Sequence, residues 1–509
     1  MNIRKAKDEI KNSIKAYLTK NPQGEYAIPA VRQRPILLMG PPGIGKTAIM
    51  EQVAEECNIA LVSYTITHHT RQSAVGLPFI EKMYYNKESY SVTQYTLSEI
   101  IAAVYDKISK SSLSEGILFI DEINCVSETL APTMLQFLQC KTFGNHKVPE
   151  GWIIVAAGNP PEYNKSVREF DIVTLDRVKR IDVEPDYEAW KEYAYKSKIH
   201  GAIMSYLELK KDRFYDVRTT VDGKIFATAR GWEDLSVIIT SYEKLGIKVD
   251  YELILEYIQH PSIAMDFANY YDLYNKYRAD YRIEDIFKGK VTNDVCDRLK
   301  TAPFDERYSI VAHLMSGLTA VFAEADLQTR FVGNVFDMLK ETMEIYEKSC
   351  ENIRTDANKV TDDAREQLRR KIAANAISGN ALTALQGAIR YVDETALKYG
   401  SGSEHNPVTE EAFAAIKRDF ERVKNEREEV LDNASQYLSN AFDFILRTFG
   451  EEQELIMFVT ELSINYYAVS FINDEGCDKY TYYASRFLVG DRQRGILEDI
   501  RTVRENERL

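Results

Sequence analysis

One eight-residue stretch limits the folds open to this chain more than any other feature: Gly40-Pro41-Pro42-Gly43-Ile44-Gly45-Lys46-Thr47. It follows an apolar run over residues 35–39 and precedes an alternating apolar and polar run that predicts a helix. A strand, a glycine-rich loop and a helix in this order, with the spacing G-x-x-x-x-G-K-T, are typical of a phosphate-binding loop. The glycines let backbone N–H groups point at phosphate oxygens, and the helix adds its positive N-terminal end. The stretch therefore predicts a site for a nucleoside triphosphate.

Two side chains of the loop and two later carboxylates predict hydrolysis as well as binding. Lys46 can reach the β- and γ-phosphates, and the Thr47 hydroxyl can hold Mg²⁺. The apolar run over residues 116–120 ends in Asp121 and Glu122, as a buried parallel strand does at its carboxyl edge. We expect Asp121 to hold the same Mg²⁺ and Glu122 to polarise the attacking water. A pair of helix-capping carboxylates is the structural alternative.

A third polar group follows another predicted strand. Residues 152–157 are apolar and lead into Gly158-Asn159-Pro160-Pro161. The Asn159 amide would lie beside the two carboxylates and could orient the attacking water. Taken alone, Asn159 is better explained as a turn residue before prolines.

The order of the predicted elements gives the fold class. Strands alternate with helices, which predicts a parallel, doubly wound α/β sheet. From Tyr187 onward the periodicity predicts helices throughout. The predicted domains are an N-terminal helix (1–29), an α/β core with a parallel sheet (30–185), an α-helical lid (186–258), a helical extension (259–350), and a long helical hairpin with C-terminal helices (351–509).

A stretch between the second strand and the second core helix departs from this alternation. Two tyrosine-bearing runs, residues 84–85 and 90–92, flank Asn86-Lys87-Glu88-Ser89. Such runs around a polar turn predict a β-hairpin inserted before the helix. An ordinary surface loop is the alternative.

The C-terminal half contains a heptad pattern. From Thr409 the apolar residues alternate three and four apart, with one break at Arg427, over more than four heptads, ending at Phe444. We expect this helix to fold back on residues 361–399 as an antiparallel hairpin, because the polar stretch 400–407 predicts a loop between them. A partner-binding rod is the alternative.

Composition excludes several classes of protein. The chain has 509 residues and a net charge of −14. This negative charge argues against sequence-independent binding of nucleic acid. No apolar segment follows the first five residues, so we expect no signal peptide. No window approaches eighteen uninterrupted apolar residues, so we expect no membrane segment. The six cysteines form no C-x-x-C pair and lie at no zinc-ligand spacing. Free thiols of this kind predict a cytoplasmic protein.

With two later arginines, Arg177 and Arg230, these motifs give the chain a family resemblance. It resembles an AAA+ ATPase over about residues 30–258 and, within that class, the MoxR family. The MoxR cues are the hairpin inserted in the second helix and three short runs: Gly76-Leu77-Pro78, Ile120-Asp121-Glu122-Ile123-Asn124 and Ala157-Gly158-Asn159-Pro160. The C-terminal half shows no motif of the family.

The resemblance implies roles for the core residues. Gly45, Lys46 and Thr47 are similar to a Walker A motif, and Asp121 and Glu122 are similar to a Walker B motif. The other roles are also assigned by resemblance alone, with Asn159 similar to sensor 1 and Arg230, at the start of a lid helix, similar to sensor 2.

Arg177 resembles the arginine finger, which reaches into the site of a neighbouring subunit. Many relatives have Phe after this arginine, whereas Val178 stands there in this chain. Arg168 and Arg180 are close enough in sequence to leave the assignment open. A surface ion pair is the structural alternative for Arg177.

The resemblance also implies a function. It implies an ATPase that uses Mg²⁺ and hydrolyses ATP to ADP and phosphate, in a homo-oligomeric ring that is commonly a hexamer. Its implied work is chaperone-like remodelling or activation of a partner protein, together with a von Willebrand factor A domain protein. A helicase-like nucleic-acid motor is a second hypothesis, which the acidic charge disfavours. A nucleotide-gated scaffold of a defence or signalling complex is a third.

Overall fold

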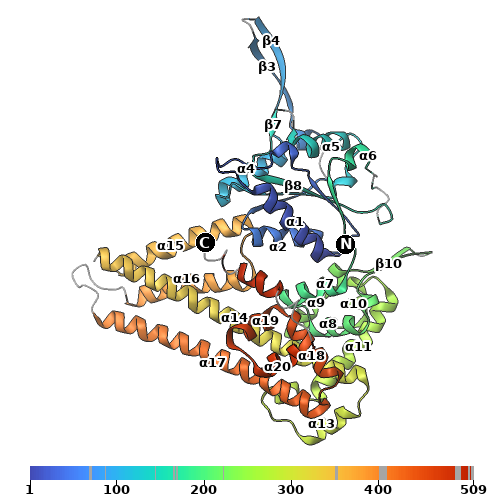
Figure 1. The fold of residues 1–509 in the computed structure, drawn as a ribbon, viewed down its shortest axis with the longest axis vertical. Coiled ribbons are helices and arrows are strands. Elements are labelled where there is room, and N and C mark those ends of the chain that lie inside the picture. Colours follow the sequence, from blue (N-terminus) through green and yellow to red (C-terminus); the bar gives the residue numbers. More distant parts are fainter. Residues whose placement is uncertain are drawn as a thin grey trace. The chain divides into compact units, whose positions relative to one another are not determined.

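The computed structural model describes residues 1–67, 71–85, 88–143, 145–163, 167, 170–221, 223–349, 353–399, 410–487, 495–502 and 505. The chain divides into two compact units. The first unit comprises residues 1–189 and 369–377, and the second comprises residues 190–368 and 378–509. Figure 1 shows the elements of both units.

The first unit is built on a five-stranded parallel sheet, as the sequence predicts. The strand order is β2-β5-β8-β1-β9. Leu38 of β1 lies opposite Ala157 of β8 on one side and Ile181 of the edge strand β9 on the other. The strands that carry the predicted site therefore end at one edge: β1 (Ile36–Met39), β2 (Ala60–Thr65), β5 (Gly116–Asp121), β8 (Trp152–Gly158) and β9 (Lys179–Asp182).

Helices connect these strands and bury their apolar residues. The sheet positions Leu118 and Ile154 are fully buried in a core shared with the helices. The N-terminal helix α1 packs on α2, where the Lys7 and Lys11 ammonium groups each lie 2.6 Å from a carboxylate oxygen of the buried Glu56. The helices of this unit are α1 (Ile3–Leu18), α2 (Lys46–Cys57), α3 (Arg71–Val75), α4 (Glu99–Ser111), α5 (Ala131–Cys140) and α6 (Ile172–Leu175), with 3-10 turns at Ala30–Arg32 and Ile123–Cys125.

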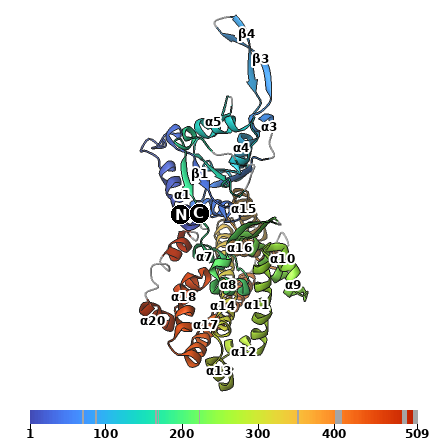
Figure 2. The ribbon, with the colours of Figure 1, turned by 90° about the vertical axis from the view of Figure 1, so that its right-hand side faces the viewer.

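The inserted hairpin is confirmed. β3 (Pro78–Tyr85) and β4 (Glu88–Tyr95) pair in antiparallel register, and the predicted turn residues Asn86 and Lys87 lie outside the described residues. This β3–β4 arm projects away from the parallel sheet in both views (Figures 1 and 2). At its base, the carbonyl oxygen of Tyr95 lies 2.9 Å from the His146 Nε2 atom, so the arm is joined to the short hairpin of β6 (Thr142–Phe143) and β7 (His146–Lys147).

The second unit is mostly helical, but the prediction of helices throughout is wrong at residues 216–227. These residues form an antiparallel hairpin of β10 (Asp216–Thr220) and β11 (Gly223–Ala227). The physical reason is local: Thr219, Thr220 and Val221 are β-branched and disfavour a helix, and a glycine follows the turn. The helices of this unit are α7 (Tyr187–Lys196), whose first residues belong to the other unit, α8 (Gly201–Leu209), α9 (Ala229–Leu245), α10 (Tyr251–Tyr257), α11 (Pro261–Asp280), α12 (Ile283–Phe287), α13 (Asn293–Lys300), α14 (Phe304–Ser349), α16 (Gly379–Tyr399), α17 (Glu410–Phe449), α18 (Gln453–Ile464), α19 (Tyr466–Glu475) and α20 (Asp478–Phe487).

The heptad helix exists, but its predicted partner is corrected. It is α17, and it packs mainly along α14 rather than along residues 361–399. The ring of Phe413 lies 5.3 Å from that of Tyr346, and the ring of Phe420 lies 6.0 Å from that of Phe336, so the two helices run antiparallel. The predicted partner is not one helix, because α15 (Ile353–Ala374) ends and α16 starts at Gly379.

α16 also packs on α14 and makes a smaller contact with α17. Near the end of α16, the Lys398 ammonium lies 2.8 Å from the Asp419 carboxylate of α17. The predicted loop over residues 400–407 lies outside the described residues. The pairing of α17 therefore follows the long apolar face of α14, with α16 beside it.

Among the described residues, α14 is the single unbroken helix that is long and apolar enough to cross a membrane by length and composition. The bent pair α18 and α19 passes the same criterion only if taken as one span. Most of the apolar window of α14 is buried within the structure, so length and composition are weak support for a span.

Candidate functional site

The glycine-rich loop lies between β1 and α2, as its spacing predicts. Gly43 and Gly45 have φ angles of 73° and 90°, in the left-handed region where glycine is favoured. A Cβ atom on Gly40 would lie 2.7 Å from the backbone oxygen of Val183, so only glycine fits there. No side chain among the described residues caps the first turn of α2, which leaves its N–H groups free to face a phosphate.

Lys46 lies at the first position of α2, with its side chain mostly buried. Its ammonium group donates hydrogen bonds of 2.8 Å to the carbonyl oxygens of Gly40 and Pro41 and to the Asn159 side-chain oxygen. The loop and the end of β8 therefore hold one positive charge at the mouth of the loop. Such a charge is placed to meet phosphate oxygens.

Thr47, in the first turn of α2, meets Asp121 at the end of β5. The Thr47 hydroxyl lies 3.3 Å from the Asp121 carboxylate, and the backbone N–H of Glu122 donates to the other Asp121 oxygen at 2.9 Å. A hydroxyl and a carboxylate that converge are the hard oxygen ligands that Mg²⁺ prefers. The donor set at this point fits a magnesium ion.

Glu122 has an unusual backbone conformation. Its φ angle of 56° places it in the left-handed region, which is rare for a residue with a side chain and is often found at functional sites. No hydrogen bond or ion pair of its side chain is found among the described residues. The Glu122 carboxylate is therefore available to act on water.

Asn159 is held by Asn124, a residue without a predicted role. The buried Asn124 side chain donates from Nδ2 to the Asn159 carbonyl oxygen at 2.8 Å and accepts from the Asn159 N–H at 3.3 Å. A Cβ atom on Gly158 would lie 2.7 Å from the Asn124 Oδ1 atom, so the glycine makes room for this pair. The one feature of the sequence that could have pointed to Asn124 is its place two residues after the Asp121-Glu122 pair, as a polar residue in the run from Ile120 to Asn124.

The structure brings Lys46, Thr47, Asp121 and Asn159 together, whereas Arg177 and Arg180 of the same unit contact other residues. Arg177 is exposed and donates to the side-chain oxygen of Gln139 on α5. Arg180 is exposed and forms an ion pair with Asp182.

The remaining two arginines are described only in part or not at all. Arg168 lies outside the described residues. Arg230 is exposed in the first turn of α9 and belongs to the second unit, so its position is described within that unit only. The roles of these arginines stay predictions.

Comparison with known proteins agrees with the geometry of the loop and strand ends. Residues 36–175 match the family model described as ATPase family associated with various cellular activities (AAA). The match begins at β1 and ends at the last residue of α6, so it includes every residue of the site just described. No curated protein matches the chain.

Proposed function

We propose that the AAA ATPase domain over residues 36–175 makes this chain a MoxR-like AAA+ protein, which uses ATP hydrolysis to remodel or activate a partner protein. AAA ATPase domains bind ATP, typically with Mg²⁺. The observation that supports the proposal most is the convergence of Lys46, Thr47, Asp121 and Asn159 at the loop, next to a free Glu122. The MoxR-type role is supported by the arm inserted between β2 and α4.

The residues of the loop have distinct tasks in this proposal. The N–H groups of the loop and the Lys46 ammonium bind the β- and γ-phosphates, and Thr47 and Asp121 hold Mg²⁺. Glu122 accepts a proton from the attacking water, and Asn159 orients that water. Asn124 fixes the position of Asn159 and is a positioning residue.

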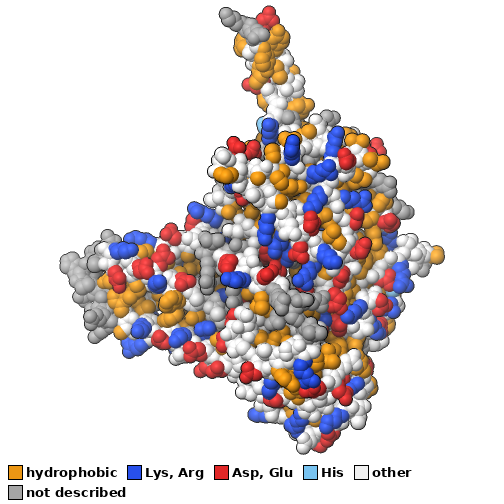
Figure 3. Space-filling view, viewed as in Figure 1, with side chains coloured by type: hydrophobic (Ala, Val, Ile, Leu, Met, Phe, Trp, Pro, Cys, Tyr) orange, Lys and Arg blue, Asp and Glu red, His pale blue; other side chains and the backbone are white. Residues whose placement is uncertain are grey.

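The β3–β4 arm is the proposed contact for a partner protein. Ile80 and Tyr84 are each about three-quarters exposed, and Tyr85 is about half exposed. Figure 3 shows apolar side chains along much of the arm. Exposed apolar surface of this kind is typical of interaction sites. The arm is joined through Tyr95 and His146 to the hairpin that follows α5, within the same unit as the nucleotide loop.

We further propose a ring of subunits in which Arg177 completes the site of a neighbour. Its exposure and the exposed apolar Ile172 and Val173 on α6 support an interface at this place. The test mixes inactive Arg177→Ala subunits with inactive Lys46→Ala subunits. In a ring, the mixture regains activity because some interfaces then pair an intact loop with an intact arginine. Failure to regain activity would count against a shared site.

The identity of the partner is tested with a variant that binds ATP without hydrolysing it. Full-length Glu122→Gln protein, incubated with ATP, is expected to retain a partner that contains a von Willebrand factor A domain. Changing both Ile80 and Tyr84 to Asp is expected to abolish this capture while ATP hydrolysis continues. The control is Val221→Asp, which places one such charge at the fully exposed tip of the β10–β11 hairpin and should leave capture unchanged.

Two outcomes would contradict the proposal. If the variant with Asp at both Ile80 and Tyr84 still captures the partner, the β3–β4 arm is not the contact. ATPase activity stimulated by DNA with a steep salt dependence, without protein capture, would favour the nucleic-acid motor instead.

A further inference from the structure

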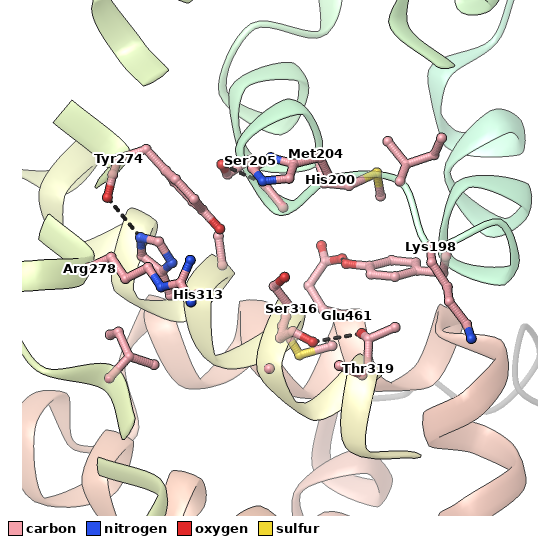
Figure 4. Close-up of a pocket in the computed structure, with 18 of the residues that line it drawn as sticks. Lys198, His200, Met204, Ser205, Tyr274, Arg278, His313, Ser316, Thr319 and Glu461 are labelled. Carbon is pink, nitrogen blue, oxygen red and sulfur yellow. Dashed lines mark hydrogen bonds between the residues drawn. The ribbon is translucent and has the colours of Figure 1, made fainter. Parts of the chain in front are cut away.

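The pocket of the second unit does not select a ligand by its charge. It has a volume of about 400 Å³ and is lined by residues of α7, α8, α9, α11, α12, α14 and α18 (Figure 4). The described lining contains as many cations as carboxylates, namely Lys191, Lys198 and Arg278 against Glu243, Glu284 and Glu461. The outer edge of strand β4, in the first unit, has a more definite chemistry.

The register of the β3–β4 arm shows which backbone groups of β4 point outward. The Thr96 N–H donates to the Leu77 carbonyl oxygen at 2.9 Å, and this pair extends the register of the arm by one position. In an antiparallel ladder, such hydrogen-bonded pairs alternate with pairs whose N–H and C=O groups point away from the partner strand. The residues of β4 with outward groups are therefore Ser89, Ser91, Thr93 and Tyr95.

Two observations agree with this alternation. Pro78, opposite Tyr95, has no N–H to donate within the ladder. The outward carbonyl oxygen of Tyr95 lies 2.9 Å from the His146 Nε2 atom of the β6–β7 hairpin. This contact covers only the base of the edge. Over residues 89–93 the outward N–H and C=O groups have no hydrogen-bond partner among the described residues.

Strand β4 lacks the features that usually protect a free edge. Edge strands commonly carry lysine or proline, which oppose pairing with another strand. β3 has Pro78 at its start and Lys82 halfway along. β4 contains no Lys, Arg, Pro or Gly, and its one charged residue is Glu88 at its start. Its Tyr, Val and Thr residues favour extended backbone, so β4 rather than β3 offers the edge that can pair.

Other edge strands of the protein are covered. Just beyond β9, the Glu184 N–H donates to the Met1 carbonyl oxygen at 2.9 Å. In β11, the Phe226 N–H donates to the Gln259 carbonyl oxygen at 2.9 Å, and β10 carries Arg218 at its centre. The open edge of β4 is therefore not a feature that these strands share.

The two faces of the arm differ in charge. The register places the exposed Glu81 and Glu88 on one face, where the described arm residues include no Lys, Arg or His. The opposite face carries Ile80 and Tyr84 together with Lys82. Side chains of a strand alternate between faces, and opposite charges on neighbouring strands attract. A strand that alternates basic and apolar residues would therefore match both faces.

We infer that the partner protein pairs an extended segment with the outer edge of β4, with its basic residues on the face of Glu81 and Glu88. Its apolar residues then lie on the face of Ile80 and Tyr84. In strand addition, backbone hydrogen bonds provide affinity and alternate side chains provide specificity. The inference rests on the proposed function, because it takes the arm as the contact for the partner.

The test uses a fluorescently labelled peptide, Lys-Val-Lys-Val-Lys-Val-Lys with an amidated C-terminus, and anisotropy measured with the full chain. One matched peptide has Glu in place of every Lys, and another is N-methylated at every residue. We expect the first peptide to bind at least tenfold more tightly than either. Equal binding of the N-methylated peptide would overturn the inference, because it cannot donate backbone hydrogen bonds. Absence of binding at millimolar concentration would overturn it too.

Hydrogen exchange in the unmodified chain locates the binding. The peptide is expected to slow exchange of the Ser91 and Thr93 N–H groups at least tenfold. The Ile80 and Lys82 N–H groups point outward from the other edge, on β3, and their exchange should change less than twofold. Equal protection of both edges would contradict the assignment to β4.

A proline on each edge provides a matched pair of variants. Ser91→Pro removes one outward N–H without removing a hydrogen bond between β3 and β4, and should weaken the peptide at least tenfold. Lys82→Pro, directly opposite, removes an outward N–H of β3 and should not weaken it, since the lost positive charge can only favour a basic peptide. Wild-type affinity in Ser91→Pro would contradict the inference. So would a smaller assembly of Ser91→Pro in sedimentation, because a second copy of this chain would then cover the edge.

The inference and the proposed function fail separately. Partner capture by Glu122→Gln protein with ATP that survives Ser91→Pro, but not the change of Ile80 and Tyr84 to Asp, would keep the arm as the contact and overturn strand pairing. Peptide binding that depends on the Ser91 N–H, in protein that captures no partner, would support the edge as a strand-binding site and contradict the proposed partner role.

Discussion

The replacement of Asn124 by alanine tests whether the link between two strand ends sets the rate of hydrolysis. Asn124 follows β5, and its amide makes two hydrogen bonds with the backbone of Asn159 at the end of β8. Asn159 in turn accepts from the Lys46 ammonium at 2.8 Å. Loss of the Asn124 amide therefore removes the support of a group that contacts Lys46 and that we propose orients the attacking water.

The magnitude follows from the number of contacts. Each of the two hydrogen bonds contributes about 1 kcal/mol net, so the local cost is about 2 kcal/mol, and buried groups left unpaired add to it. A displacement of about 1 Å at a group that positions a reactant can cost on the order of 100-fold in rate. We expect Asn124→Ala to lower the turnover of ATP about 100-fold. The dissociation constant of ATP should change less than fivefold, because the loop N–H groups stay in place.

The assay combines steady-state ATP hydrolysis with hydrogen exchange at the amides of β8, which reports local opening. Gly158→Ala perturbs the same link from the other side, because its Cβ atom would lie 2.7 Å from the Asn124 Oδ1 atom, and it should give the same loss. Gly333→Ala on α14 is the control, since its Cβ atom would meet nothing within 4 Å. Turnover at the wild-type rate in Asn124→Ala, with unchanged exchange in β8, would refute the reasoning.

Two further predictions concern stability. Burial lowers the pKa of Lys141 from 10.5 to about 8, with Gln33 as its neutral partner at 3.0 Å, so the fold disfavours the charged lysine. Because the unfolded chain then binds more protons between pH 8 and 10.5, wild-type stability rises with pH in that window. Lys141→Met should stabilise the protein by about 2 kcal/mol at pH 7, from about 3 kcal/mol of relieved charge burial less about 1 kcal/mol for the lost hydrogen bond. Melting temperatures of Lys141→Met and wild type at pH 7 and pH 10.5 check this prediction. A difference in melting temperature that favours the variant more at pH 10.5 than at pH 7 would contradict it. Lys191→Met leaves the buried Glu461 carboxylate without its cation, whereas Glu208 keeps Lys211 at 2.9 Å. The substitution should destabilise the second unit by about 3–5 kcal/mol, measured by denaturant unfolding followed by tryptophan fluorescence; a loss below 1 kcal/mol would count against the ion-pair account.

The nucleotide loop could be predicted from sequence because its signal is local. Glycines, a lysine and a threonine at fixed spacing between a strand and a helix determine both the backbone path and the chemistry. The helix predicted after the loop agrees with α2, and the strand predicted to end in Asp121 agrees with β5. The inserted hairpin was also predicted, since a polar turn between two β-favouring runs is a local pattern too.

The missed features depend on contacts between distant segments or on a weak local signal. The role of Asn124 depends on β5 and β8 being neighbours in the sheet, which their order along the chain does not reveal. The apolar face of α17 was visible, but a heptad pattern shows that a helix has a partner and not which one it is. The β10–β11 hairpin was overlooked although Thr219, Thr220 and a turn ending in Gly223 carried the signal.

The most direct test of the central claim is ATP hydrolysis by full-length Glu122→Gln protein. The substitution keeps the size of the side chain and removes only its capacity to accept a proton from water. We expect ATP binding within threefold of the wild-type value and turnover at least 100-fold lower, because Thr47, Asp121 and Lys46 are unchanged. Hydrolysis by this variant at the wild-type rate would contradict the assignment of the loop and the two strand ends as the hydrolytic site.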